Sequence, residues 1–410
     1  MRPRVVVRLY HVASRAWLTA AGLALLLPER DRLGIWLPLH LTLAGAVSVA
    51  ISGSMQGFAS ALTATPAPAT GTVLAQWALV NAGVVLVGIG YPFGHPALLA
   101  AGGTCFLCGM AVLAWMVGRA WRRGLNRRHA LPMAMYGCAL VAILSGGTLG
   151  ALIGSGAVRE PALWVALRRA HMTVNVLGWV SLTIAGTLVT LLPTVLRIRM
   201  PAWHGGGTAA LLIGGVAMIA GGLGLSSPPV AAAGGIAYAL GALGLAWMVG
   251  RAITSPRRWP VPVSAKHLVL AVCWFVFGAV ALSVALVRGE ASFDAFRELY
   301  LVAFVGGWIV QTLLGAWLYL LPMARPGHPD ERRRVLAAIE LGGLLQVGAL
   351  DGGLVLMALR AGGLLPEVWG PVGTGLALGG AALALAKAWA FPLLARAPVL
   401  SDRQLQVWGG

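Results

Sequence analysis

Long apolar stretches, separated by short polar connections, fill nearly the whole of this sequence. A helix needs about 20 apolar residues to cross a bilayer, and the chain holds about twelve stretches of that kind. Only 10% of its residues are charged, whereas a soluble domain carries about 25%. We therefore predict an all-α polytopic membrane protein, a single integral membrane domain over residues 1–410. The predicted spans lie near residues 12–27, 34–62, 71–91, 96–118, 131–157, 164–196, 208–226, 229–252, 266–288, 298–322, 335–361 and 366–394.

Lysine and arginine are distributed unevenly between the connections. Of these residues, 21 fall in the two tails and in every second connection, whereas eight fall on the opposite side. Basic residues concentrate on the cytoplasmic side of membrane proteins. The pattern predicts a multi-pass protein with both termini in the cytoplasm. It accounts for the net charge of +18 without nucleic acid, and leaves membrane lipid as the expected partner, including anionic lipid.

Several segments recur at a nearly constant spacing. The octapeptide LAWMVGRA stands at residues 113–120 and again at 245–252, an offset of 132 residues. GWVSLTIAGTLVTLLP at residues 178–193 resembles GWIVQTLLGAWLYLLP at 307–322, an offset of 129. Four spans fit in this interval, so every copy keeps the same orientation and the repeats are parallel. The approximate repeats are residues 1–130, 131–260 and 261–410.

The repeats place two histidines and a tyrosine at one equivalent position. HLTL at residue 40 matches HMTV at residue 171, and His40, His171 and Tyr300 then fall near the outer ends of three spans. Of the eight histidines, only these two lie well inside predicted spans. Histidine within a membrane faces the protein interior, and neutral imidazole is a strong ligand for haem iron and copper. We predict a non-covalent haem b with His40 and His171 as metal ligands and Tyr300 as a further candidate; the alternative is hydrogen bonding within the fold.

Other polar side chains surround these positions. Arg168 and Arg169 precede His171 directly, and guanidinium binds carboxylates such as haem propionates; the alternative is that both extend to the membrane surface. Asn175 lies one helical turn after His171 and would orient the imidazole or bond a neighbouring helix. Gln311, with a glycine four residues away on either side, is a further candidate at the cofactor, or a hydrogen-bonding residue between helices.

Two acidic residues stand in one predicted span. Glu340 and Asp351 are eleven residues apart, a spacing that returns to the same helix face within about 20°. Acidic residues inside a membrane suggest a function, so this pair is a candidate proton path. The alternative is that Asp351 is the partner of an arginine such as Arg360.

A haem-free transporter or copper-handling protein is the alternative function. Parallel repeats suit a transporter, and Cys105 and Cys108, one helical turn apart, would bind copper together with His40. Packing of two small side chains is the other interpretation of these cysteines. A structural or assembly subunit is a third class. The chain has no GxxxxGK[ST] phosphate loop, so no nucleotide partner is indicated.

Twelve spans in three parallel four-helix units, with histidines in the second and sixth, resemble subunit I of haem-copper oxidases and nitric oxide reductases. HLTLAGA at residues 40–46, AHMTVNVLGWVSLTIAGTLVTLLP at 170–193 and TLLGAWLYLLP at 312–322 are similar to the NnrS-type membrane proteins and to the membrane segment of some bacterial copper nitrite reductases. The resemblance implies haem, with copper as a second metal. It also implies the bacterial inner membrane, and either nitric oxide handling or respiratory electron transfer to a redox partner protein. A haem-dependent oxidoreductase acting on nitrogen oxides is one candidate; enzymatic activity itself stays open. The histidine pairs of the oxidases are absent from the seventh and tenth spans.

Overall fold

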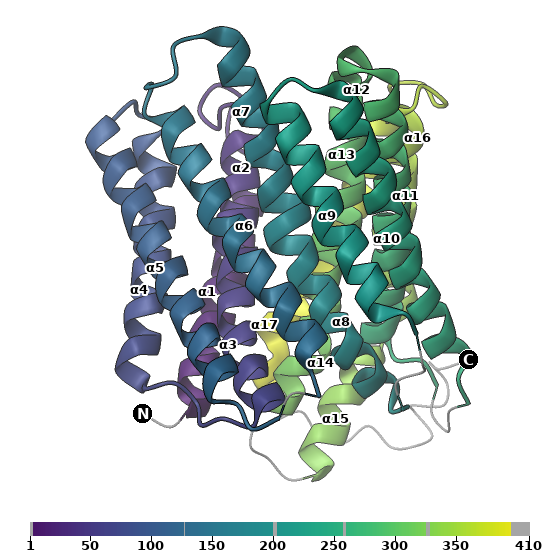
Figure 1. Cartoon of the computed structure of the whole chain (residues 1–410). Coiled ribbons are helices and arrows are strands. Elements are labelled where there is room, and N and C mark those ends of the chain that lie inside the picture. The colour runs from purple at the N-terminus through teal and green to yellow at the C-terminus, as the bar shows by residue number, and fades with distance from the viewer. Residues whose placement is uncertain (1–2, 127, 200–202, 257–259, 325–328, 395–410) are drawn as a thin grey trace. The chain divides into compact units, whose positions relative to one another are not determined.

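The computed structural model describes residues 3–126, 128–199, 203–256, 260–324 and 329–394, and these segments are helical, without a strand (Figure 1). Within these ranges, 11 helical segments are long and apolar enough to cross a membrane. They are Trp36–Thr63, Thr70–Gly90, Pro96–Arg123, Ala130–Gly154, Pro161–Leu196, Gly205–Gly224, Pro228–Thr254, Val263–Arg288, Arg297–Met323, Gly343–Ala361 and Trp369–Ala390. The chain is therefore a multi-pass helical membrane protein.

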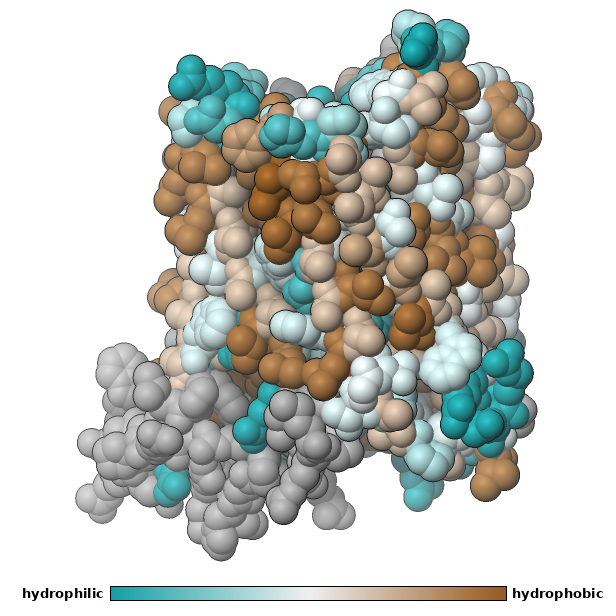
Figure 2. Space-filling view, turned by 90° about the vertical axis from the view of Figure 1, so that its left-hand side faces the viewer, coloured by the Kyte–Doolittle hydropathy of each residue, from teal (hydrophilic) through white to brown (hydrophobic). Residues whose placement is uncertain are grey.

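These segments correspond to every predicted span except the first. Residues 12–27 were expected to cross the membrane, but α1 (Pro3–Ala24) is not among the candidate spans. Its sequence includes Arg8, His11 and Arg15, which lower its hydropathy below that of a typical span. On the face drawn in Figure 2, apolar side chains cover a broad central region, and most hydrophilic ones gather toward the two ends, as a lipid-facing surface requires.

The chain divides into two compact units, each with its own packing. Unit 1 comprises residues 1–187 and 205–241, and unit 2 comprises residues 188–204 and 242–410. Unit 1 contains α1, α2 (Trp36–His40), η1 (Leu41–Val47), α3 (Ser48–Thr63), α4 (Thr70–Gly90), α5 (Pro96–Arg123), α6 (Ala130–Gly154), α7 (Pro161–Thr173), η2 (Val174–Val180), the start of α8 (Ser181–Leu196), α9 (Gly205–Gly224) and the first half of α10 (Pro228–Thr254).

Glycines bring the helices of unit 1 close together. A Cβ atom at Gly83 of α4 would lie 2.7 Å from the backbone nitrogen of Phe106 in α5, and one at Gly102 of α5 would lie 2.7 Å from the backbone nitrogen of Val87. Small residues at such contacts allow helices in lipid to approach until their backbones touch. The interface therefore fixes α4 against α5, and with it the wall of the cavity described below.

Unit 2 packs in a similar manner around its own core. It contains α11 (Val263–Arg288), α12 (Glu290–Ala295), α13 (Arg297–Tyr300), η3 (Leu301–Val310), α14 (Gln311–Ala324), α15 (Pro329–Glu340), α16 (Gly343–Ala361) and α17 (Trp369–Leu394), with the ends of α8 and α10. Val335 and Ile339 of α15 are buried against Val263, Leu318 and Val347. This short helix is thus part of the unit 2 core.

In the described part of the chain, three long helices pass through a π-helical stretch. η1 begins directly after His40, η2 begins three residues after His171, and η3 begins directly after Tyr300. In a π-helix each N–H bonds the carbonyl five residues back, instead of four as in an α-helix, and such stretches are frequent at functional sites. Each of the three stretches therefore begins within three residues of His40, His171 or Tyr300.

The predicted span over residues 335–361 is interrupted. α15 ends at Glu340, Gly342 has a left-handed backbone with φ of +63°, and α16 begins at Gly343. Glu340 and Asp351 consequently lie on two different helices. The prediction that they share one helix face is wrong, because the spacing argument requires an unbroken helix.

Candidate functional site

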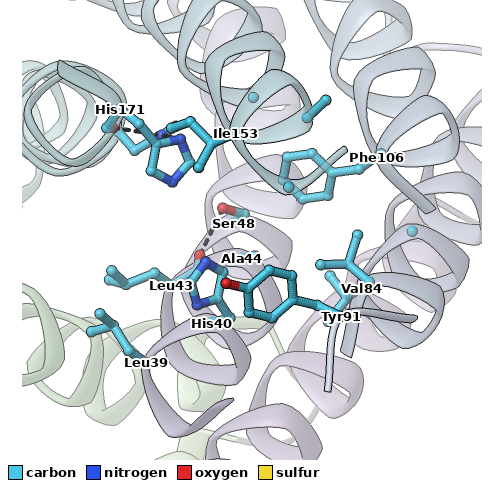
Figure 3. Close-up of a pocket in the computed structure, with 18 of the residues that line it drawn as sticks. Leu39, His40, Leu43, Ala44, Ser48, Val84, Tyr91, Phe106, Ile153 and His171 are labelled. Carbon is cyan, nitrogen blue, oxygen red and sulfur yellow. Dashed lines mark hydrogen bonds between the residues drawn. The ribbon is translucent and has the colours of Figure 1, made fainter. Parts of the chain in front are cut away.

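A cavity of about 360 Å³ in unit 1 brings His40 and His171 together. Its walls come from α2, η1, α4, α5, α6, α7 and η2 and are mostly apolar, with Leu43 and Phe106 among the lining residues. Both imidazoles point into it from different helices (Figure 3). The predicted site residues that line this cavity are His40, Arg168, His171 and Asn175.

The His40 side chain is held in one orientation. Its Nδ1 lies 2.8 Å from the backbone oxygen of Trp36, one turn earlier. A carbonyl oxygen only accepts hydrogen bonds, so in a neutral ring Nδ1 carries the proton and Nε2 keeps its lone pair. The Trp36 ring also stacks on the imidazole, with centroids 4.1 Å apart, and Tyr91 stacks on Trp36 at 4.4 Å. The stack and the hydrogen bond together leave Nε2 available as a ligand atom.

His171 has an equivalent arrangement with a different partner. Its Nδ1 lies 2.8 Å from the backbone oxygen of Gly146 in α6. The Asn175 amide nitrogen donates to the backbone oxygen of His171 at 2.8 Å and lies 3.1 Å from Nδ1. By the same reasoning Nε2 of His171 keeps its lone pair. Outer hydrogen bonds of this kind fix the tautomer and ring direction of metal-binding histidines.

Glycines of α6 make the space that these side chains occupy. A Cβ at Gly150 would lie 2.7 Å from Cε1 of His171, and a Cβ at Gly146 would lie 2.5 Å from Oδ1 of Asn175. Any larger residue would push the imidazole or the amide aside. The sequence signal for this space is SGGTLG at residues 145–150, which puts Gly146 and Gly150 one helical turn apart on the same face.

The two arginines before His171 have separate environments. Arg168 lines the cavity, and its guanidinium carbon lies 5.3 Å from the centroid of the Trp164 ring. Arg169 is buried, with 8% of its surface exposed, but it does not line the cavity. Neighbouring helical residues point about 100° apart, so one helix turn cannot direct both toward the same ligand. Of the two arginines expected to bind an anionic group, only Arg168 therefore lines this cavity.

Tyr300 and Gln311 belong to unit 2 and do not line this cavity. Tyr300 is buried against Phe296 and Phe304, with ring centroids 6.0 and 4.9 Å away. Gln311 donates from its amide nitrogen to Asp351 at 2.7 Å. Neither residue therefore lines the cavity with His40 and His171, and their role at a cofactor stays a prediction.

The acidic residues also have partners of their own within unit 2. Glu340 accepts hydrogen bonds from the backbone nitrogen of Val263 at the start of α11, at 3.0 and 3.1 Å. Asp351 accepts from the indole nitrogen of Trp274 at 2.9 Å. Arg360, weighed as a partner for Asp351, instead pairs with Glu298 and Glu367. Glu340 thus caps the start of α11, and Asp351 has a separate set of hydrogen-bond partners.

The expectation that only His40 and His171 enter spans is also wrong. His267 lies in α11, is fully buried, and has its Nε2 2.7 Å from the amide nitrogen of Gln346. Gly315 makes this possible, because a Cβ there would lie 2.8 Å from Cβ of His267. The predicted span begins at residue 266, which puts His267 at its very start, whereas α11 begins at Val263 and His267 is its fifth residue.

The cysteines give no metal cluster in the part of the chain that the structure describes. Cys105 is half-buried, Cys108 is exposed, and neither lines the cavity, although Phe106 and Leu107 between them do. No group of three or more His, Cys, Asp or Glu residues among the described positions is arranged to hold a metal ion. A bare copper site usually needs several protein ligands, whereas haem iron takes only axial ligands from the protein. The two imidazoles therefore fit haem better than bare copper.

Comparison with known proteins leaves the family open. No protein-family model matches the chain, and no curated protein matches it at a significant level. The structure itself shows a multi-pass helical membrane protein in which two preoriented histidines line one cavity.

Proposed function

We propose that unit 1 binds haem b in the cavity between His40 and His171. One observation carries this proposal. Two imidazoles from different helices line one cavity, and each has its Nδ1 beside a backbone oxygen, which leaves Nε2 for a metal. Polar atoms are costly in a membrane interior, and preorientation of this kind is what a haem-binding histidine requires.

The rest of the cavity suits the same ligand. Its volume of about 360 Å³ falls within the range of about 300–1,000 Å³ for cofactor sites. Apolar walls favour a flat hydrophobic macrocycle, and the α6 glycines leave room beside His171. Arg168, oriented by Trp164, supplies a positive charge at the cavity that would hold a propionate. In this assignment His40 and His171 would hold the iron, and Asn175 would fix the direction of His171.

The cellular role follows from the motif resemblance. A bound haem would supply one-electron chemistry while both imidazoles are ligands, and it would offer a binding position for a small gas such as nitric oxide only where one of the two imidazoles leaves the iron. We propose a protein of the oxidase-like, NnrS-related type in a bacterial inner membrane, handling nitric oxide or passing electrons to a partner. The three π-helices after His40, His171 and Tyr300, together with the repeated motifs, support three related four-helix repeats.

An absorption spectrum tests the haem. We expect protein purified in detergent after haem-supplemented expression to show a Soret band and a haem content near one per chain. His40→Ala and His171→Ala should each lower this content, because each removes an iron ligand. His95→Ala and His204→Ala are matched controls, since both histidines are exposed and lie outside the cavity lining.

Two outcomes would overturn the assignment. The first is a folded protein without a Soret band despite ample haem. The second is a band that survives both cavity substitutions but not the control substitutions. Stoichiometric copper that disappears in a Cys105→Ser and Cys108→Ser double variant would favour the haem-free, copper-handling alternative.

A further inference from the structure

Asp351 lies within the membrane-crossing helix α16 and has no charged partner among the described residues. Its two carboxyl oxygens accept hydrogen bonds from the Trp274 indole at 2.9 Å and the Gln311 amide at 2.7 Å. These donors are neutral and come from two other helices, α11 and α14. An acidic residue held in this way is not explained by an ion pair, and acidic residues in spans are functional candidates.

Several charged groups of the neighbouring elements have other partners, and the remaining ones lie near helix ends: Lys266 near the start of α11, Arg288 at its last residue and Arg297 at the first residue of α13. α16 packs against α11, α13, η3 and α17. On these elements Lys387 of α17 donates to the backbone oxygens of Ile339 and Leu341, and Glu298 of α13 pairs with Arg360. In α11, His267 bonds Gln346, and the Cys273 thiol is the group that interacts electrostatically with Asp351. η3 carries no ionisable side chain.

Gln311 supplies the second observation. Its side chain is fully buried, and its amide oxygen has no hydrogen-bond partner while its amide nitrogen bonds Asp351. A carboxylate needs a donor, whereas a protonated carboxyl also needs an acceptor for its O–H. A carboxamide offers both, and exchanging its ends requires only a rotation of the amide group. Gln311 is thus matched to both protonation states of Asp351.

The surroundings of Asp351 act on its two protonation states in opposite directions. Removal from water favours the neutral acid, whereas two N–H donors favour the carboxylate. We propose that Asp351, with Gln311 and Trp274, forms a reversible proton-binding site within the membrane part of unit 2. The proton comes from water and binds one carboxyl oxygen, so the site passes from a charge of minus one to neutral and no other bond changes. The site does not depend on haem binding in unit 1.

The position of Gln311 suggests what the proton would influence. Gln311 is the first residue of α14, directly after the π-helix η3. Asp351 therefore holds the residue at which the π-helix returns to α-helical hydrogen bonding. Protonation would weaken the charge-assisted hydrogen bonds from Gln311 and Trp274, and so would loosen the junction between η3, α11 and α16.

Infrared spectroscopy of the full chain in lipid nanodiscs tests the proposal. Titration from alkaline to acid pH should reveal the carbonyl band of a protonated carboxyl that is absent in Asp351→Asn. Glu298→Gln, which removes an exposed carboxylate, should leave the band unchanged. Trp274→Phe should move the titration midpoint of this band to higher pH by about one unit, because the indole can only donate and so stabilises only the carboxylate.

Gln311→Leu should move the midpoint by less than Trp274→Phe, since the amide serves both states. Circular dichroism of each variant shows whether the helices are retained. A band assigned to Asp351 that is present at every pH, or absent at every pH in a folded wild-type protein, would overturn the proposal. So would a midpoint that Trp274→Phe leaves unchanged.

Discussion

At the scale of single residues, the α6 glycines decide whether His171 can reach the cavity. A methyl group at Gly150 would lie 2.7 Å from Cε1 and 3.0 Å from Nδ1 of His171, inside normal contact distance. We expect Gly150→Ala to turn the imidazole and lower haem affinity by about 10- to 100-fold, as loss of outer-shell support does at metal sites. Haem titration of the apoprotein measures this affinity.

Gly137→Ala is the matched control for that experiment. Gly137 lies on the same helix, and a Cβ there meets nothing within 4 Å, so haem affinity should stay unchanged. Equal losses in the two variants would mean that α6 as a whole had been disturbed, and would contradict the specific role of Gly150.

Trp36 supports His40 through its ring as well as through its backbone oxygen. Trp36→Ala keeps the backbone hydrogen bond to Nδ1 but removes the ring stacked at 4.1 Å. An aromatic contact contributes about 1 kcal/mol, which corresponds to about a fivefold loss of haem affinity. Trp36→Phe retains a stacking ring and should lose less. If both variants bound haem like wild type, the stack would have no part in orienting His40.

The residues of the site differ in how visible they are in the sequence. His40, His171 and Asn175 could be identified because polar side chains stand out in apolar spans. Gly146, Gly150 and the Trp36–Tyr91 stack were missed, since their importance arises from contacts between helices far apart in the chain. Such contacts depend on how helices face each other, which no local pattern records.

At the scale of elements, the π-helices end at residues with specific side-chain bonds. Ser48 follows η1 and donates from its hydroxyl to the backbone oxygen of Leu43 at 2.8 Å. Ser181 follows η2 and donates to the backbone oxygen of Val176 at 2.7 Å. Both bonds reach five residues back, which is the hydrogen-bond spacing of a π-helix. These stretches could not be predicted, because a shift of one hydrogen-bond partner leaves the apolar pattern of a span intact.

Ser48 has a second role that makes its removal costly. Its hydroxyl also accepts from the indole nitrogen of Trp179, at 3.0 Å, in the buried centre of unit 1. Ser48→Ala leaves that buried donor unpaired, and we expect a loss of about 1–3 kcal/mol in the free energy of unfolding. Ser145→Ala, at an exposed serine bonded within its own helix, should change it by less. Denaturant unfolding in detergent micelles compares the two, and equal effects would contradict a special role for Ser48.

The break between α15 and α16 depends on one backbone conformation. Gly342 has φ of +63°, and a Cβ there meets nothing within 4 Å. Gly342→Ala therefore tests the backbone alone, with an expected cost of about 1–2 kcal/mol for a left-handed residue with a side chain. Gly348→Ala within α16 also has free space and should be neutral or stabilising, because alanine favours helix. A lower midpoint of thermal unfolding for Gly342→Ala alone would agree; no difference between the two variants would contradict it.

At the scale of the whole molecule, individual spans were easier to predict than their grouping. A span can be recognised from one continuous stretch of about 20 apolar residues. The candidate spans of the described chain accordingly lie close to the predicted ones. The contacts group the spans into two compact units, a grouping that the sequence did not indicate, and the single domain of three repeats stays a prediction. Which helix faces meet depends on small residues such as Gly83 and Gly353, whose partners cannot be identified from spacing alone.

Topology gives the last prediction, because the charge distribution predicts an orientation that hydropathy alone does not. With cysteines 105, 108, 138 and 273 replaced by alanine, we expect cysteines introduced at Asp31 and Ser155 to react with an impermeant maleimide added to spheroplasts. A cysteine at His204 should react only in inverted vesicles, since we expect the connections rich in arginine to face the cytoplasm. All three positions are exposed. The opposite labelling pattern would reverse the orientation.

An affinity tag placed before Met1 then shows whether α1 crosses the membrane. A tag on the cytoplasmic side, opposite Asp31, means that α1 crosses despite its arginines. A tag on the same side as Asp31 means that α1 does not cross.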